Sequence, residues 1–317
     1  MKQTIKCEAR VYESKYINKE VKSLHKFLRA IGFSQFDTRK KVQSLVKACV
    51  LDCTEKNLTE NGEDTMLAEY CKDFSPYFGI AVCGELSDEN HKFSYDYYYP
   101  YLKTAGISTY EDINVERHAF RESYAGICDD IRVGISLIFY LQNMIDYVKI
   151  KNSDRLPIQG TSLCLSALSV DGMVMMPINK NEKQKERFKK KTNNRYRLIQ
   201  QARQGDEKAI ESLTLDDMDT YSSISKKILN EDVFSIVDSY FMPYGVESDQ
   251  YSILGEILEC QKIENELTKE QIYIMTIDCN ELCFELCINE KDIFGEPEVG
   301  RRFKGSIWLQ GFINFPE

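Results

Sequence analysis

The segment 295–315, GEPEVGRRFKGSIWLQGFINF, constrains the fold of this chain more than any other stretch. It holds the only tryptophan, Trp308, and four of the sixteen glycines. Gly300 and Gly305 flank a short basic cluster, and the residues after it have the pattern of a strand that ends the chain. We therefore expect a terminal strand that docks into a sheet, with glycines where the backbone approaches another segment closely.

The basic cluster between these glycines consists of Arg301, Arg302 and Lys304. Two arginine forks and one lysine can hold a phosphate or a carboxylate through charge-assisted hydrogen bonds. Together with Trp308, these three residues form the predicted ligand-binding site. The structural alternative is ion pairing with acids of the same chain, namely Glu296, Glu298 or the pair Asp129 and Asp130.

Charge and cysteine usage limit the compartment and the partners. The net charge of −9 argues against nucleic acid as a partner. The first residues, MKQTIKCEARVYESKY, carry charges where a secretory signal has its apolar region, and the longest apolar run, 133–141, is short for a membrane span. Eleven cysteines without a disulfide framework indicate reduced thiols. We expect a cytoplasmic protein without a membrane partner.

Three cysteines with regular spacing, Cys279, Cys283 and Cys287, raise the question of a metal. The surrounding residues alternate as strands do, and thiols four residues apart in an extended chain lie roughly 13 Å from each other. No histidine lies nearby in the sequence to complete a common zinc set. The sequence therefore predicts neither a metal site nor a cofactor.

The order of patterns along the 317 residues suits two packed units, or one domain with an insertion. We predict an α+β fold with antiparallel β-rich halves, N-terminal helices and a helical insertion. The C-terminal part is expected to form a small curved sheet or an open barrel. The expected divisions are a poorly ordered extension at 1–23, an N-terminal α+β part at 24–179, a charged helical insertion at 180–244 and a C-terminal β-rich part at 245–317.

Several local elements follow from periodicity and turn residues. A helix within 24–34 should end at Gly32, and a second helix should run to about Asp52 after a cap at Asp37 or Thr38. A short helix is expected around 66–72. The runs 78–86 and 91–102 indicate a hairpin, and 161–178 indicates another with Asp171 and Gly172 at its turn.

A search for catalytic motifs finds neither the glycine-rich nucleotide fingerprints nor the GxSxG and HExxH motifs, so no catalytic residue is assigned. His118 has acids and Cys128 nearby in the sequence, which leaves a hydrolase-type site as an alternative, although a packed or solvated histidine is the simpler interpretation. Asp129 and Asp130 should point to opposite faces of a strand, with a salt bridge to Arg132 as their simpler role. The tyrosines of 95–101 are expected to pack rather than to stack bases.

Four segments, 24–34, 213–221, 231–245 and 295–315, resemble an uncharacterised bacterial family of Firmicutes and Clostridia, domain of unknown function 3881. The resemblance covers residue 24 to the end of the chain. It implies a cytoplasmic bacterial protein and carries over no catalytic residues. The resemblance also implies that family members begin with Met at the position of Leu24, so that 1–23 is an extension. These residues are polar and charged, with no apolar face to bury, and we expect them to contribute little stability.

Three classes of function remain open at this point. The first is a non-catalytic binding or regulatory protein, with an anion-binding loop at Arg301, Arg302 and Lys304. The second is a hydrolase-type enzyme that uses His118. The third is a structural or assembly protein with a protein partner or self-association, which a flat apolar patch near Trp308 would favour.

Overall fold

The computed structural model describes most of the chain, namely residues 25–60, 65–87, 92–118, 123–153, 160–178, 194–202, 204–228, 233–246 and 248–316. The predicted extension 1–23 lies outside these ranges. Within them, no helix combines the length and the apolar character that crossing a membrane requires.

A four-stranded antiparallel sheet, sheet A, follows two N-terminal helices. The elements are η1 (Lys26–Ile31), α1 (Arg39–Leu51), β1 (Glu55–Glu60), β2 (Thr65–Asp73), β3 (Phe78–Ser87) and β4 (Phe93–Leu102). The helix ends form as their residues predict. Gly32 takes a left-handed φ of 95° at the end of η1, and the Thr38 hydroxyl accepts the Lys41 N–H at the start of α1. The predicted hairpin of β3 and β4 is confirmed.

The remaining strands form a ten-stranded sheet, sheet B. Its elements are β5 (Ile113–Arg117), β6 (Tyr124–Asp130), β7 (Ile135–Leu141), β8 (Ser162–Met175), β9 (Tyr240–Pro243), β10 (Gln250–Glu264), β11 (Gln271–Cys279), β12 (Leu282–Asn289), β13 (Ile293–Phe294) and β14 (Arg302–Asn314). Two further elements, α2 (Met144–Asn152) and η2 (Glu290–Asp292), connect strands. Sheet B is mostly antiparallel, so the predicted α+β class is confirmed.

Part of sheet B closes into a barrel. The strands β8, β12, β11, β10 and β14 pair in that order, and β14 then pairs with β8 along almost its whole length. The terminal strand is therefore docked between two others, as its sequence predicted. Gly305 lies opposite Gly172, and a Cβ atom at Gly305 would lie only 2.5 Å from the Asp171 carbonyl oxygen. Here the missing side chain is what lets the two backbones approach.

Two local predictions are wrong. The segment 161–178 is one continuous strand, β8, rather than a hairpin, because β14 and β12 pair along its two edges and the Asp171–Gly172 step stays extended against β14. Residues 66–72 belong to strand β2 rather than to a helix. Pairing on both sides, with β1 and β3, overrides the helical preference of Met66, Leu67 and Ala68.

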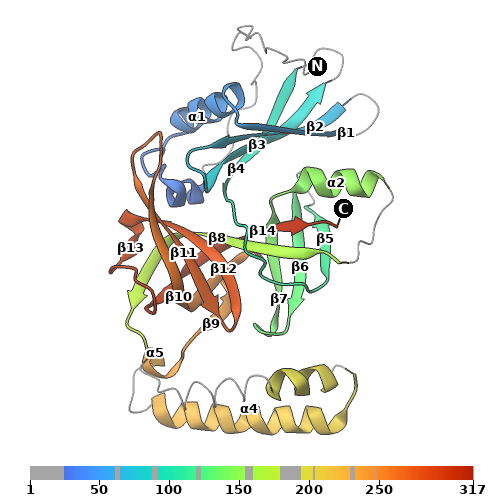
Figure 1. The fold of residues 1–317 in the computed structure, drawn as a ribbon, viewed down its shortest axis with the longest axis vertical. Helices are drawn as coiled ribbons and strands as arrows, with labels where there is room; N and C mark the ends of the chain where they lie inside the picture. The colour runs from blue at the N-terminus through green and yellow to red at the C-terminus, as the bar shows by residue number, and fades with distance from the viewer. Residues whose placement is uncertain are drawn as a thin grey trace, which may run out of the picture.

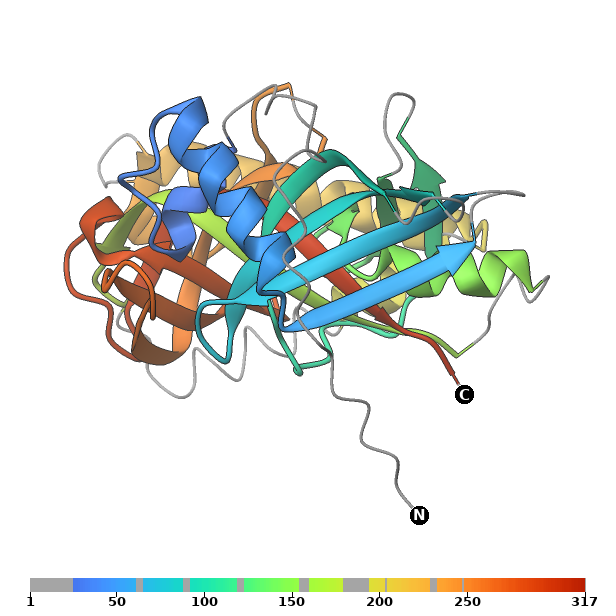
Figure 2. The same cartoon turned by 90° about the horizontal axis from the view of Figure 1, so that it is seen from above.

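Sheet A, the barrel and the insertion lie at three levels of the molecule, seen from top to bottom in Figure 1. Seen from above, α1 lies across sheet A (Figure 2). One core cluster joins η1, α1 and sheet A to barrel residues such as Ile272 and Trp308. The second cluster fills the barrel and extends under β7 and α2. Sheet A is thus packed on the barrel through shared apolar side chains.

The predicted insertion contains a helix at 194–202, α4 (Glu207–Ile228) and α5 (Val233–Ile236). Figure 1 places α4 below the barrel, with α5 between the two. An ion pair between Arg195 and Asp217, with nitrogen and oxygen 2.7 Å apart, links the first helix to α4. Residues 179–193, which include the first part of the predicted insertion, lie outside the described residues.

Barrel side chains hold the end of η1. The carbonyls of Arg29, Ala30 and Ile31 accept hydrogen bonds from Asn289 Nδ2, Cys287 Sγ and Asn265 Nδ2, respectively. The Arg29 carbonyl also accepts the Gly32 N–H. The carbonyls of Ala30 and Ile31 lie at the helix end, where intrahelical partners are lacking, so the barrel side chains satisfy them. The Asn289 amide also donates to the nearly buried carboxylate of Glu270 at 2.6 Å.

Glu270 should make the protein sensitive to acid. Burial alone would raise its pKa, but hydrogen bonds from Ser34, Lys291 and Asn289 outweigh burial and lower it. An acid whose pKa is lowered by folding adds stability above its unfolded pKa, and this stability is lost as the pH falls through the folded pKa. We expect Glu270→Gln to cost about 1–2 kcal/mol at pH 7, and the difference from the unmodified protein to shrink as the pH falls below about 4.

Urea unfolding at pH 7, 5 and 3 measures this effect. The matched control is Glu264→Gln, because Glu264 pairs with the exposed Lys269 at the surface. Its cost should stay below about 0.5 kcal/mol at every pH. A Glu270→Gln difference that is as large at pH 3 as at pH 7 would contradict this assignment.

Candidate functional site

The four residues of the predicted anion site have separate partners. Arg301 pairs with Glu298 at 2.8 Å, which is one of the acids that the structural alternative named. The Arg302 guanidinium is buried, and Lys304 places its ammonium 4.1 Å from the centre of the Phe234 ring. The Trp308 indole donates to Asp249 at 2.7 Å. Anion binding by this loop therefore stays a prediction, with protein partners already present at each side chain.

Trp308 itself is a core residue, 5% exposed. Its ring stacks on Phe27 with centroids 5.4 Å apart and also contacts His25 and Tyr140. The indole thus joins η1 to the barrel. Trp308 is thus surrounded by side chains of the protein core, and not by the flat apolar patch that would favour an assembly function.

The acids and the histidine considered for catalysis lie apart. His118 is exposed just after β5. Asp129 is exposed and Asp130 is buried, so they point to opposite faces as predicted, and Asp130 pairs with Arg132. In the part of the chain that the structure describes, no three His, Cys, Asp or Glu side chains are arranged so that they could hold a metal ion.

A row of polar side chains crosses one face of sheet A. Asn57 is opposite Glu69, Glu69 is opposite Cys83, and Cys83 is opposite Tyr97. Directly opposite residues in an antiparallel sheet point to the same face, so the four side chains form one line from β1 to β4. This face is the one directed toward α2 and β7, because Tyr97 reaches Met144 and the neighbouring Tyr99 reaches the Gln142 carbonyl.

Glu69 is the unusual member of this row, since it is an acidic residue that is only 4% exposed. The Tyr99 hydroxyl lies 2.8 Å from its Oε1, and the Cys83 thiol donates to the same atom at 3.7 Å. Burial raises the pKa of Glu69 to about 6, although hydrogen bonds from Tyr99, Asn57 and Cys83 oppose this rise. A carboxyl group tuned to near-neutral pH by its surroundings is a physical marker of a functional site.

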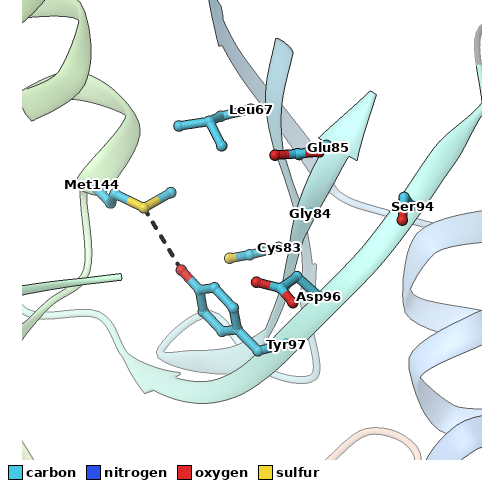
Figure 3. Close-up of a pocket in the computed structure, with 8 residues that line it drawn as sticks. All are labelled: Leu67, Cys83, Gly84, Glu85, Ser94, Asp96, Tyr97 and Met144. Atoms are coloured by element: carbon cyan, nitrogen blue, oxygen red, sulfur yellow. Dashed lines mark hydrogen bonds between the residues drawn. The ribbon is translucent and has the colours of Figure 1, made fainter. Parts of the chain in front are cut away.

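A hollow of about 130 Å³ lies in front of this row (Figure 3). It is lined by Leu67 on β2, by Cys83, Gly84 and Glu85 on β3, by Ser94, Asp96 and Tyr97 on β4, and by Met144 at the start of α2. Cys83 lines the hollow and its thiol contacts Glu69, so the Cys83 side chain separates Glu69 from the hollow.

A β-bulge shapes this hollow. Cys83 is opposite Tyr97 and Gly84 is opposite Tyr95, so Asp96 is an extra residue on β4. Consecutive residues of a regular strand point to opposite faces, but a bulge changes the direction of its side chains. Here the consecutive residues Asp96 and Tyr97 both line the hollow. Gly84 is needed at this point, because a Cβ atom there would lie 2.1 Å from the Ser94 carbonyl oxygen.

The chemistry of the lining favours binding over covalent catalysis. Burial raises the pKa of the Cys83 thiol well above its usual range, so the sulfur is a protonated thiol at neutral pH rather than a nucleophilic thiolate. Burial also raises the pKa of the Tyr97 phenol. Glu69, the group tuned for proton exchange, reaches the hollow only through the Cys83 sulfur.

The sequence interpretation missed Glu69 because 66–72 was assigned to a helix, where an acid is an ordinary solvated residue. The available signal was one charged residue within the otherwise uncharged run TMLAEYC. Read as a strand, this run places Glu69 on the same face as Leu67 and Cys71. The tyrosines of 95–101 were correctly expected to pack, since all five are buried.

Comparison with known proteins identifies a family for this chain. A family model described as "Domain of unknown function, E. rectale Gene description (DUF3881)" matches residues 28–311. No curated protein and no solved structure matches the chain.

Proposed function

The chain belongs to the DUF3881 family, a family of unknown function, and for this member we propose a non-catalytic role: it binds a small molecule in the hollow between sheet A and the start of α2. The observation that carries the proposal is the bulge that turns Asp96 and Tyr97 together into a hollow backed by the buried Glu69. Bulges of this kind are over-represented next to functional sites, and a polar group of altered pKa beside a concavity is the usual sign of one.

We further infer that the protein acts in the cytoplasm. In the described part of the chain, the ten cysteines are all free thiols, and several lie buried in the sheets. Free thiols in such number suit a reducing compartment.

Binding can be followed at the hollow itself. Met144 lines it, so labelling the methionine methyl groups with carbon-13 provides a local reporter, with Met144→Leu to assign its signal. We expect a screen of small polar metabolites, cationic, anionic and neutral, to include compounds that shift the Met144 methyl signal and leave that of the distant, exposed Met173 unchanged.

A variant that fills the hollow supplies the control. Leu67→Trp adds bulk to a lining side chain and should abolish these shifts while the cooperative unfolding transition is kept. If no compound in the screen moves the Met144 signal, or if the shifts persist in Leu67→Trp, the proposed site is wrong.

A further inference from the structure

The lining of the hollow has a consistent electrostatic character. Glu85 and Asp96 are exposed at its rim, and none of its eight lining residues is basic. The carboxyl group of Glu69 lies directly behind the wall. An anionic ligand would meet three acids here without a compensating cation from the lining, and like charges at this range repel.

The apolar part of the lining suits a soft cation. The Tyr97 hydroxyl donates to the Met144 thioether sulfur at 3.6 Å, so an aromatic side chain and a thioether line the hollow next to each other (Figure 3). Aromatic faces attract cations through the ring quadrupole, and this attraction strengthens where water is excluded. A thioether is polarisable and adapts to irregular apolar shapes. A weakly hydrated organic cation can interact both with the acidic rim and with the apolar side chains of this lining. A strongly hydrated metal ion would instead need several converging oxygen ligands.

We propose that the ligand of this hollow is a small organic cation, held between the Tyr97 ring and the carboxylates of Glu85 and Asp96, and that its binding expels a proton from Glu69 into solvent. The inference rests on the proposed function and adds the ligand class and the proton linkage.

The proton linkage follows from the hydrogen bonds of Tyr99. Its single hydroxyl lies 2.8 Å from Glu69 Oε1 and 3.0 Å from the Gln142 carbonyl oxygen, and it can donate to only one of them. When Glu69 is protonated, its O–H donates to the Tyr99 oxygen and Tyr99 donates to Gln142. When Glu69 is ionised, Tyr99 donates to the carboxylate instead. Both protonation states therefore have a satisfied arrangement around Glu69.

Among the described groups that shift the pKa of Glu69, none is a cation. Glu55 on β1 adds a repulsive charge, while Asn57, Cys83 and Tyr99 are neutral partners. On β2, Cys71 is also a neutral thiol, because burial raises its pKa. The helix α2 contributes Met144 to the hollow. Of its charged residues, Asp146 and Lys149 pair with each other, and Lys151 is exposed in the last turn. A ligand cation would thus supply the positive charge that the ionised form of Glu69 lacks.

The direction of the pH dependence is set by the pKa of Glu69 and by the charge of the ligand. Glu69 titrates near pH 6 in the unliganded protein, and a cation about 7–10 Å away favours its ionised form. Binding then releases a proton at pH 5 to 6, and the affinity rises as the pH increases from 5 to 7. At an effective dielectric constant of 20 to 40, the expected rise in affinity between pH 5 and 7 is about fivefold.

The test uses three probe cations, namely ethylammonium, guanidinium and choline chloride, in buffers of constant ionic strength. The neutral analogue of choline, 3,3-dimethyl-1-butanol, has the same shape without the charge. We expect at least one cation to shift the Met144 methyl signal, and the neutral alcohol to bind at least fivefold more weakly than choline if choline is that cation. Binding of neutral or anionic compounds only would overturn the inference while leaving the proposed function intact.

Variants separate the two parts of the inference. Asp96→Asn combined with Glu85→Gln should weaken the cation at least fivefold, whereas the matched pair Glu211→Gln and Asp219→Asn, exposed on α4, should not. Glu69→Gln should retain binding but lose the pH dependence between 5 and 7, together with the proton release measured by calorimetry in buffers of different ionisation enthalpy. A pH profile that is flat in the unmodified protein, or unchanged in a folded Glu69→Gln variant, would refute the linkage.

Discussion

Replacing Arg302 by alanine is expected to destabilise the protein by about 3–5 kcal/mol, although nothing in the sequence separates this arginine from its neighbour. Its buried guanidinium donates to the carbonyl oxygens of Met176 at 3.1 Å, Val237 at 2.9 Å and Phe234 at 2.8 Å. The substitution leaves three carbonyls without this partner. Because these carbonyls belong to the end of β8 and to the α5 region, the insertion should also detach more easily from the barrel.

Arg301→Ala is the matched control. Arg301 reaches only the exposed Glu298 and the Glu296 carbonyl oxygen, so its removal should change stability by less than about 1 kcal/mol. Urea unfolding followed by the fluorescence of the buried Trp308 measures both changes, and limited trypsin digestion reports the release of the insertion. Equal effects of the two substitutions would contradict this division of roles.

The same pair of variants tests the anion-binding prediction. A phosphate site at Arg301, Arg302 and Lys304 should raise the melting temperature of the unmodified protein in phosphate, and Arg301→Ala should reduce that rise. If phosphate has no effect on the unmodified protein, while Arg302→Ala unfolds it more easily, the cations serve the fold alone.

Gln310→Leu is expected to cost about 3 kcal/mol. Gln310 is fully buried on β14. Its amide nitrogen donates to the Pro100 carbonyl oxygen at 2.8 Å, and its oxygen accepts from Leu102 N–H at 3.3 Å and from Gln142 Nε2 at 2.8 Å. Leucine has a similar volume but leaves the backbone groups at the end of β4 unsatisfied inside the interface between sheet A and the barrel.

Chemical unfolding monitored by both Trp308 fluorescence and circular dichroism checks this prediction. Because Gln310 joins sheet A to the barrel, the two signals should coincide in the unmodified protein and separate in the variant. The control is Gln261→Leu at an exposed position of β10, which should change stability by less than about 0.5 kcal/mol. An unchanged stability in Gln310→Leu would show that apolar packing alone holds the two layers together.

Local patterns predicted the elements whose neighbours in sequence are sufficient to define them. The helix ends at Gly32 and Thr38 follow from the residues' own backbone and side-chain preferences. The strands β11 and β12 follow from alternation, and β3 and β4 follow from two apolar runs with a polar connection. The hairpin at 161–178 failed because Asp171–Gly172 is a turn only when no long partner strand is present, and β14 is that partner.

Local sequence patterns could not predict the candidate site. Asp96 lines the hollow only because a bulge shifts the register between β3 and β4, and the bulge depends on how Gly84 packs against the Ser94 backbone. Glu69 becomes unusual only when the folded chain buries it beside Tyr99 and Cys83. Each of these facts depends on segments that lie far apart in the sequence.

Hydrophobic periodicity and turn residues act over a few residues, so they were sufficient to predict an α+β protein with a terminal strand docked into a sheet. Which polar groups are buried, and what they face, depends on how distant segments pack together. Arg301 and Arg302 are adjacent and chemically identical, yet one pairs at the surface and the other holds three buried carbonyls. Burial and hydrogen bonding arise from segments that meet only on folding, so no local pattern of residues could distinguish the two.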